Sequence, residues 1–264
     1  MKAVAVIPAR YASTRFPGKP LVAETGQPLV QHVVARAAQA RRVSRIIVAT
    51  DDNRIFAAVR SFGGEAVMTR PDHPSGTDRI VEAAGGLTAD LVLNIQGDEP
   101  EIDPNHLDGL IELMEADPQA EVGTLACPFA VIPGSDPRDP NAVKVVLDVR
   151  GRAIYFSRSL IPHPRGFETS GRVHQAAPYL LHVGVYAYRP AFLTSLAGLA
   201  PTPLERTEQL EQLRWLEHGH KIAVRVVESA AKGIDTPEDY AAFVKRYCGS
   251  APPADRHTTG HGVA

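Results

Sequence analysis

Short apolar runs alternate with helical patterns along the first half of the chain, and this alternation restricts the fold more than any other feature. Apolar runs at 3–7, 45–50 and 91–95 have the length of strands, and a shorter run covers 65–69. Between the first two runs, apolar residues recur at helical spacing over 29–38. Continuous apolar runs are typical of parallel strands that helices cover on both faces. The sequence therefore predicts an α/β fold with a doubly wound, mostly parallel sheet.

The pattern changes after residue 121, where strand-like runs crowd together. They cover 122–129, 142–147, 153–157 and 182–188, with few helical patterns between them. This stretch predicts a β-rich insertion lobe that covers the binding crevice of the sheet. The chain then returns to alternation, with a helix expected over 204–217, a strand over 221–227 and a closing helix over 239–247.

Composition limits the functional classes. The 264 residues are 44% hydrophobic and 22% charged, which is ordinary for a soluble globular protein. A net charge of −2 does not favour nucleic-acid binding, and no window of about 18 apolar residues predicts a membrane span. The two cysteines, Cys127 and Cys248, exclude a disulfide framework and a cysteine zinc site. Because the first residues also lack a signal-peptide pattern, we expect a cytoplasmic protein.

Histidines gather at two places near the end of the chain. The stretch 249–264 is rich in Gly, Pro, Thr and His and has almost no apolar residues, so it predicts a disordered tail. Metal binding by His257 and His261 is the alternative for this stretch. His218 and His220 flank a glycine, and a helix stop explains them better than a metal clip does.

The first apolar run leads directly into a basic loop, P-A-R-Y-A-S-T-R-F-P-G-K-P, over 8–20. Ligands of open α/β sheets bind beyond the carboxyl ends of the strands, so Arg10, Arg15 and Lys19 are expected to lie over the binding crevice. Guanidinium groups, an ammonium and backbone N–H groups suit a polyphosphate. The loop is neither a P-loop, because Pro20 follows Gly-Lys where Ser or Thr is required, nor a GxGxxG turn. An ordinary basic surface loop is the alternative.

An acidic turn, N-I-Q-G-D-E-P, follows the apolar run at 91–95. Gly97 permits a tight turn, and Asp98 then projects into the same crevice as the basic loop. Magnesium binds through one or two carboxylates together with phosphate oxygens, so Asp98 is a natural ligand beside a polyphosphate. A simple turn stays open as the alternative, since Asp and Gly are favoured in turns.

A second acidic residue, Asp235, stands in G-I-D-T-P-E-D over 233–239. Thr236 as N-cap, Pro237 at the first helical position and Asp239 three residues after the cap form an acidic variant of the capping box. Asp235 has no such capping role. Taken alone, its position leaves solvent exposure and metal binding equally open.

These segments resemble the signatures of the 3-deoxy-manno-octulosonate (Kdo) cytidylyltransferase family, and the resemblance extends over 4–247. Departures are minor and lie mostly in 164–177, which looks like a variable loop. The resemblance implies a nucleotide-diphospho-sugar transferase-like fold and the transfer of CMP from CTP to Kdo with release of pyrophosphate, in lipopolysaccharide biosynthesis. It implies a Mg²⁺ cofactor held by Asp98 and Asp235, with Arg10 and Lys19 acting beside them in catalysis.

The resemblance also implies how the chain is divided. We expect one nucleotidyltransferase domain over 1–248, followed by the tail. Within it, the nucleotide-binding half covers about 1–121, the sugar-acid and dimer lobe about 122–220, and a closing strand and helix about 221–248. The family resemblance further implies a homodimer, with the late strands as the candidate interface.

The segment D-H-P-S-G-T-D-R over 72–79 resembles the part of the family that binds the base and sugar of the nucleotide. A turn with hydroxyl groups and a glycine lets backbone groups reach a pyrimidine edge, although capping of the following helix alone would explain Thr77. The predicted nucleotide contacts are Ala9, Arg10, Arg15, Lys19, Ser75, Gly76, Thr77, Arg79 and Asp98.

The second half of the chain resembles family segments that line the Kdo pocket. A sugar acid needs a cation for its carboxylate and neutral donors and acceptors for its hydroxyl groups. The predicted acceptor contacts are Gln96, from the first half of the chain, and Lys144, Arg158, His182, Tyr186, Glu211 and Gln212. For Glu211 and Gln212, a solvated helix face is the alternative.

Other functions stay open from the sequence. A glycosyltransferase that uses a nucleotide sugar has a similar sheet but usually carries Asp-x-Asp at its metal site, and this sequence contains no such triplet. A catalytically idle nucleotide-binding protein would be expected to have lost Lys19 or one of the two aspartates, and all three are retained. Related sugar acids, such as 8-amino-Kdo, stay open as acceptors.

Overall fold

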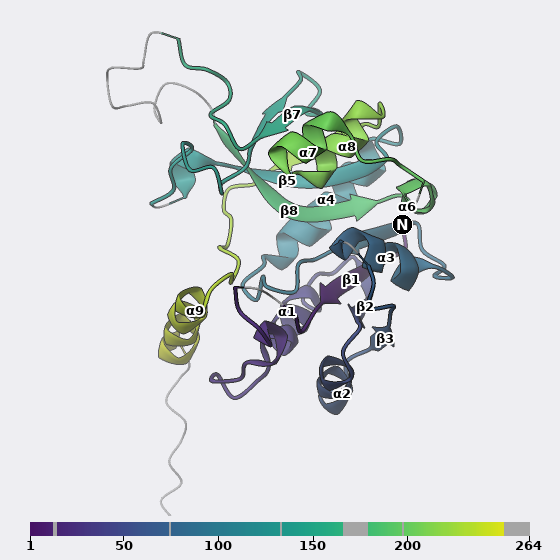
Figure 1. Cartoon of the computed structure of the whole chain (residues 1–264), viewed down its shortest axis with the longest axis vertical. Coiled ribbons are helices and arrows are strands. Elements are labelled where there is room, and N and C mark those ends of the chain that lie inside the picture. The colour runs from purple at the N-terminus through teal and green to yellow at the C-terminus, as the bar shows by residue number, and fades with distance from the viewer. Residues whose placement is uncertain (13–14, 74, 133, 166–178, 197, 251–264) are drawn as a thin grey trace, which may run out of the picture.

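The structure, a computed structural model, describes residues 1–12, 15–73, 75–132, 134–165, 179–196 and 198–250 (Figure 1). Nine strands of these residues form one mixed sheet in the order β3-β2-β1-β4-β8-β5-β9, with β6 and β7 off this path. The strands are β1 (Ala3–Ala9), β2 (Val43–Thr50), β3 (Ala66–Met68), β4 (Leu91–Asn94), β5 (Val122–Pro128), β6 (Lys144–Leu147), β7 (Ala153–Ser157), β8 (Leu180–Tyr188) and β9 (Ile222–Val226).

Helices of the described residues connect these strands. They are α1 (Leu29–Ala37), α2 (Asn53–Ser61), α3 (Gly76–Ala84), α4 (Pro104–Ala116), α6 (Pro190–Leu196), α7 (Pro203–Glu208), α8 (Glu211–Glu217) and α9 (Pro237–Ser250), with short 3-10 turns η1 (Lys19–Leu21) and η2 (Phe129–Val131). The α/β fold predicted from the sequence is confirmed.

The sheet combines a parallel part with antiparallel additions. Strands β3, β2, β1 and β4 pair in parallel, as the alternating pattern predicts. Strand β8 then pairs antiparallel with both β4 and β5, and β9 pairs in parallel with β5. The strand-rich stretch after residue 121 therefore contributes β5 and β8 to the main sheet itself. Only the antiparallel pair β6 and β7 extends off it, attached through β8.

Alternate residues of β1 pack on opposite faces of the sheet, which is why helices cover both. Ala5 and Ile7 belong to a core cluster with residues of α1, α2 and α4, whereas Val6 belongs to a second cluster with residues of α3, α6 and α8. In Figure 1, α7 and α8 lie over β5 and β8. No helix among the described residues is long and apolar enough to cross a membrane.

One helix prediction is wrong, and one helix was missed. The helix expected over 204–217 is two helices, because Gln209 adopts a left-handed conformation (φ 52°) between α7 and α8. Helix α4 was not predicted, although its first turn contains Pro104 after an N-cap, Asp103, whose carboxylate accepts the Asn105 N–H at 2.9 Å.

Two variable segments are only partly described. Of the expected tail, 249–250 are the last residues of α9, which therefore extends further than predicted, and 251–264 lie outside the described residues. Most of the expected variable loop, 166–177, also lies outside them. The division of the domain into functional parts stays a prediction.

Trp215 fixes α8 to the sheet. The indole is 1% exposed, and its ring centroid lies 5.3 to 5.7 Å from those of Tyr186, Tyr188 and Phe192, each in edge-to-face geometry. Such aromatic pairs add to the free energy gained from burial alone. Since α8 begins with Glu211, this packing also determines where that carboxylate lies.

We expect Trp215→Ala to lower the free energy of unfolding by about 3–5 kcal/mol, because it leaves a large cavity between α8 and β8. Urea unfolding followed by circular dichroism would measure the change, since Trp215 is the only tryptophan and its fluorescence is lost. Leu204→Ala is the control, because Leu204 on α7 is 38% exposed and should cost less than about 0.5 kcal/mol. A cost below about 1 kcal/mol for Trp215→Ala would contradict the packing argument.

Candidate active site

A cavity of about 420 Å³ opens at the carboxyl ends of β1 and β4, where their loops face the start of α3. It is lined by the basic loop, the acidic turn and the start of α3: Pro8, Ala9, Arg10, Ala12, Arg15, Lys19, Pro20, Ser75, Gly76, Gln96, Gly97 and Asp98. The structure therefore brings together seven of the nine predicted nucleotide contacts, and Gln96 with them. Thr77 and Arg79 are not among the lining residues.

The close approach of two loops depends on Gly97. A Cβ atom at this position would lie 2.8 Å from the carbonyl oxygen of Pro8, a distance that real Cβ atoms do not show. Glycine therefore lets the acidic turn after β4 lie against the loop after β1. Asp98 and Lys19 meet as a result.

The ammonium group of Lys19 lies between the two predicted metal ligands. Its Nζ atom lies 2.7 Å from Asp98 Oδ2 and 3.9 Å from Asp235 Oδ1, and it donates to the carbonyl oxygen of Ile234 at 2.7 Å. Arg15 donates to both carboxylate oxygens of Asp235, at 3.0 and 3.2 Å. Asp98 and Asp235, far apart in the sequence, thus share one cation, as expected of two halves of a cation-binding site.

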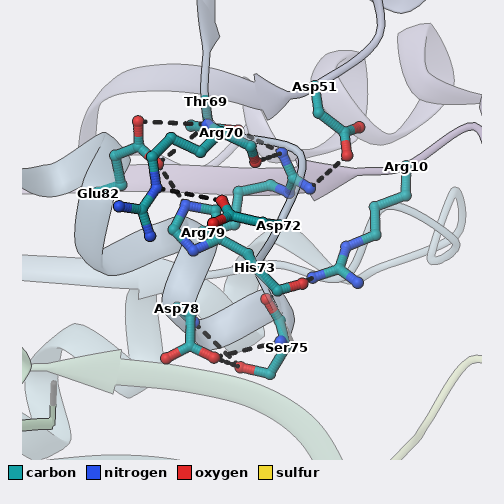
Figure 2. A network of polar contacts seen from close by, with 10 residues as sticks. All are labelled: Arg10, Asp51, Thr69, Arg70, Asp72, His73, Ser75, Asp78, Arg79 and Glu82. Atoms are coloured by element: carbon teal, nitrogen blue, oxygen red, sulfur yellow. Dashed lines mark hydrogen bonds and ion pairs between the residues drawn. The ribbon is translucent and has the colours of Figure 1, made fainter.

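Arg10 supports the loop that leads into α3 (Figure 2). Its Nη2 atom donates to the carbonyl oxygens of His73 and Ser75, at 2.9 and 2.6 Å. Burial and the neighbouring Arg79 lower the pKa of the Arg10 guanidinium. Ser75 and Asp78 form a reciprocal capping box, in which Ser75 Oγ accepts the Asp78 N–H at 3.1 Å. Arg10 therefore both lines the cavity and holds its opposite wall in place.

Arg79 occupies a different place from the one predicted. Its side chain is fully buried, and Nη2 donates to Asp51 at 2.8 Å while Nη1 donates to the Thr69 hydroxyl (Figure 2). The Nε atom is buried without a hydrogen-bond partner among the described residues. In this arrangement Arg79 cannot touch a ligand in the cavity, so the predicted direct contact is corrected to a supporting role beneath the loop.

A second cavity of about 650 Å³ lies on the other side of the acidic pair. Asp235, His182, Gly184, Lys232 and Glu99 are among its lining residues. Sequence reasoning missed Glu99, although it stands directly after Asp98 in the acidic turn. Burial, and secondly the Asp98 carboxylate, raise the pKa of Glu99 to about 8, so this residue carries a proton at neutral pH. Asp98 lines the first cavity and Asp235 lines the second, so the two cavities meet at the aspartate pair.

His182 offers a neutral imidazole to the second cavity. Its ring lies 4.9 Å from that of Phe156 and 5.4 Å from that of Tyr186, and Nε2 lies 3.1 Å from Thr124 Oγ1. Burial lowers the pKa of His182 to about 4. A neutral imidazole can both donate and accept hydrogen bonds, which suits a ligand rich in hydroxyl groups.

Glu211 and Gln212 do not form a solvated helix face. Gln212 is 5% exposed, and burial raises the pKa of Glu211 although a hydrogen bond opposes the change. That hydrogen bond comes from Thr77 Oγ1, which donates to Glu211 Oε2 at 2.7 Å. A predicted nucleotide contact and a predicted acceptor contact are thus directly joined. The alternative of a solvated surface is wrong for both residues.

Two predicted acceptor cations bind backbone carbonyls. Arg158 donates from Nε to Glu208 at 2.7 Å and from Nη1 to Pro140 at 3.0 Å. The fully buried Lys144 donates to the carbonyl oxygens of Asp139 and Arg158, at 2.9 and 2.6 Å. Neither belongs to the described residues that line the two cavities. Arg158 stabilises the turn between α7 and α8, and Lys144 joins the segment before β6 to the residue after β7.

The chain resembles known cytidylyltransferases over almost all of its length. A family model described as cytidylyltransferase matches residues 4–222. A 3-deoxy-manno-octulosonate cytidylyltransferase of Syntrophotalea carbinolica is 48% identical over 90% of this chain and 96% of its own. An 8-amino-3,8-dideoxy-manno-octulosonate cytidylyltransferase of Shewanella putrefaciens is 46% identical over 95% of this chain and 100% of its own.

A solved structure is also similar to this chain in fold and sequence. The structure of CMP:2-keto-3-deoxy-manno-octonic acid synthetase complexed with CTP superposes with a TM-score of 0.88. The two sequences are 43% identical, and the match covers 95% of this chain and 100% of the other. The fold expected from the sequence thus agrees with a known relative over nearly the whole chain.

We expect the partly buried His182 to make the fold less stable as the pH falls from about 6.5 to about 4. Over this range the unfolded chain takes up a proton that the folded chain excludes, which costs up to about 1.4 kcal/mol per pH unit. Urea unfolding of wild type and His182→Gln at pH 7 and pH 4.5 tests this. The wild type should lose about 2–3 kcal/mol more than the variant.

The same substitution at the exposed His218 is the control for loss of a surface imidazole. His218→Gln should leave the pH profile of the wild type unchanged. Parallel profiles for wild type and His182→Gln would show that His182 is accessible to protons in the folded state.

Proposed function

The chain belongs to the cytidylyltransferase family, and we propose that it transfers CMP from CTP to Kdo, giving CMP-Kdo and pyrophosphate. The observation that carries this proposal is the pairing of Asp98 and Asp235 around the ammonium of Lys19, where two cavities meet. One cavity carries the cations that suit a triphosphate, and the other carries polar and charged groups, among them His182, Asn141 and Lys232, that suit a sugar acid. Nucleotidyl transfer requires two such substrates to meet at one phosphorus.

CTP is proposed to lie in the first cavity. Arg15 and Lys19 would bind its β- and γ-phosphates, because their charged groups line the cavity beside the acidic pair. The backbone of Ser75 and Gly76, fixed by Arg10 and by the capping box, would face the base and ribose. Arg10, Lys19, Asp98 and Asp235 would then surround the reacting phosphate.

We include Mg²⁺ because the two carboxylates already hold a cation between them. Among the described residues, no group of three or more His, Cys, Asp or Glu side chains could hold a metal ion. The protein would therefore supply Asp98 and Asp235 and leave the other positions to phosphate oxygens and water, a ligand set that magnesium prefers. When bound, Mg²⁺ would polarise the α-phosphate and neutralise charge on the triphosphate.

Kdo is proposed to enter through the second cavity. Its anomeric hydroxyl oxygen would attack the α-phosphorus in line, forming one P–O bond while the bond to the β-phosphate oxygen breaks and pyrophosphate leaves. Neutral His182, which lines this cavity, would bind sugar hydroxyl groups, as would Gln96 from the first cavity. Tyr186, Glu211 and Gln212 stay predicted acceptor contacts, although none of them is among the described residues that line either cavity. The protein contributes positioning and charge stabilisation in this reaction, since it forms no covalent bond.

Arg158 needs a change of partners if it is to bind the carboxylate of the sugar acid. In the arrangement described above its guanidinium binds carbonyl oxygens of Pro140 and Glu208. It would act either by leaving these carbonyls or by holding the turn that carries Glu211. Arg15, whose side chain is 66% exposed, is a second cation close to the acidic pair.

The remaining proposals concern assembly and location. We propose a homodimer whose interface includes the late strands, because Ile154 on β7 and Val226 on β9 are apolar and 60% and 48% exposed. A cytoplasmic location follows from the use of CTP as donor. The product would be an activated sugar for lipopolysaccharide biosynthesis.

One specific observation favours a second acceptor. A relative of similar identity is named an 8-amino-3,8-dideoxy-manno-octulosonate cytidylyltransferase. The amino analogue differs from Kdo by one functional group, and the polar groups of the second cavity, such as His182, would accommodate either group.

Pyrophosphate release with CTP, Mg²⁺ and a panel of sugar acids tests the function. We expect the highest kcat/KM with Kdo. For Asp98→Asn we expect kcat to fall by about 10²- to 10³-fold or more, because this change removes a charge that positions the reacting phosphate. Asp90→Asn, on a different part of the surface, is the control. No release with any sugar acid would refute the proposal, and a higher kcat/KM with 8-amino-Kdo would change the acceptor.

We expect the wild type to bind Mn²⁺, used as a probe for Mg²⁺, only weakly without nucleotide, because the Lys19 ammonium competes for both carboxylates. Lys19→Met should strengthen Mn²⁺ binding about tenfold or more. The loss of one charged hydrogen bond changes the binding free energy by an amount that corresponds to this factor. Electron paramagnetic resonance titration measures the affinity. Lys221→Met, which removes an exposed lysine elsewhere, should change nothing. Equal affinities in wild type and Lys19→Met would refute the competition.

A further inference from the structure

Arg54, on α2, contacts the basic loop although it lies outside every motif considered above. Its guanidinium carbon lies 3.4 Å from the centre of the Tyr11 ring, so the planar cation is stacked on the aromatic face. Tyr11 directly follows Arg10 in the loop that lines the first cavity. This contact connects a surface helix to the cations proposed to bind the triphosphate.

The Tyr11 residue ties the two ends of the basic loop together. Its carbonyl oxygen accepts the N–H of Gly18 at 2.9 Å. Gly18 has a left-handed conformation (φ 72°), and a Cβ atom there would lie 3.2 Å from ring atoms of Tyr11. The tyrosine therefore packs directly on the residue before Lys19. Movement of the Tyr11 ring would displace Arg10 at one end of the loop and Lys19 at the other.

Arg54 is itself held firmly. Its Nε and Nη2 atoms donate to the two carboxylate oxygens of Asp52, at 3.0 and 2.6 Å. Asp52 is the N-cap of α2 and accepts the Arg54 N–H at 2.8 Å. The next residue, Ile55, is fully buried in the core. The guanidinium group is thus a fixed plane against which the tyrosine ring rests.

The charge of Arg54 has little direct influence on the cavity. The Asp52 carboxylate compensates it, and the Arg54 side chain is 59% exposed, so water screens what remains. What the stacked guanidinium supplies is order: it fixes the ring of Tyr11, whose carbonyl oxygen accepts the N–H of Gly18 next to Lys19. Groups that are ordered in advance bind more tightly and stabilise developing charge better than groups that must be ordered during binding.

We propose that Arg54 is a positioning residue for the nucleotide loop, stacking on Tyr11 so that Arg10, Arg15 and Lys19 are held ready for the triphosphate. This inference rests on the proposed function only for the identity of the nucleotide. Since the loop cations are proposed to face the β- and γ-phosphates, loss of the stack should weaken binding of a nucleoside triphosphate. Binding of the corresponding monophosphate should change little.

The test compares Arg54→Leu with Arg45→Leu. Arg45 on β2 also donates two N–H groups to one carboxylate, that of Glu65, but it has no aromatic partner at the loop. Arg45→Leu therefore controls for the loss of a surface ion pair. Calorimetry with CTP should show affinity about two- to fivefold lower in Arg54→Leu, the range of an exposed cation–π contact, and about unchanged affinity for CMP. Arg45→Leu should match the wild type with both nucleotides.

Hydrogen exchange gives a readout that needs no nucleotide. In the ligand-free protein, the Gly18 amide, which donates to Tyr11, should exchange about two- to fivefold faster in Arg54→Leu than in wild type or Arg45→Leu. Tyr11→Leu should reproduce the effect, Tyr11→Phe should not, and Arg54→Leu should add nothing to Tyr11→Leu. If the wild type binds no CTP, the proposed function fails while this measurement still decides the role of Arg54.

Two results would overturn the inference. Wild-type exchange at Gly18 in Arg54→Leu would show that the stack does not order the loop. Equal weakening of CTP and CMP binding would show that Arg54 supports the fold as a whole and not the loop cations.

Discussion

The ammonium of Lys19 is the contact on which the rest of the site depends. Two carboxylates from distant parts of the sequence, Asp98 after β4 and Asp235 before α9, lie close to each other. Like charges this close repel each other unless a cation lies between them. Lys19 supplies that cation and also binds the carbonyl oxygen of Ile234. The Ile234 N–H in turn donates to the carbonyl oxygen of Asp98 at 2.8 Å. The basic loop, the turn after β4 and the segment before α9 are thereby joined at one point.

The nucleotide side and the acceptor side of the site are mechanically connected. The sequence pattern assigns them to different parts of the chain, but β8 pairs with β4 inside one sheet, and Thr77 at the start of α3 donates to Glu211 at the start of α8. A displacement of α3 must therefore move the Glu211 carboxylate or break a hydrogen bond between partly buried groups, which is costly. Such a connection suits a reaction in which two substrates must align at one phosphorus.

Features encoded by local spacing could be predicted from the sequence, and features that depend on distant partners could not. Apolar runs placed the parallel strands, and turn chemistry placed Asp98 and the cap before α9. The break between α7 and α8 was missed because helical spacing continues through Gln209, whose left-handed conformation is held by the Arg158 contacts to this turn. The burial of Arg79 could not be predicted either, since its partners Asp51 and Thr69 belong to other elements.

The arginines of the site illustrate why a motif does not determine the role of a residue. Arg15 and Lys19 direct their charge at carboxylates that line the cavities, whereas Arg10 and Arg158 direct theirs at backbone carbonyl oxygens. A guanidinium group that donates to backbone carbonyls restricts the conformation of a loop, because it replaces water at acceptors that irregular loops leave unpaired. The loops around the cavities present such acceptors to Arg10 and Arg158, at His73, Ser75, Pro140 and Glu208. Their conformation before any substrate binds therefore depends on arginines that need not touch the substrate.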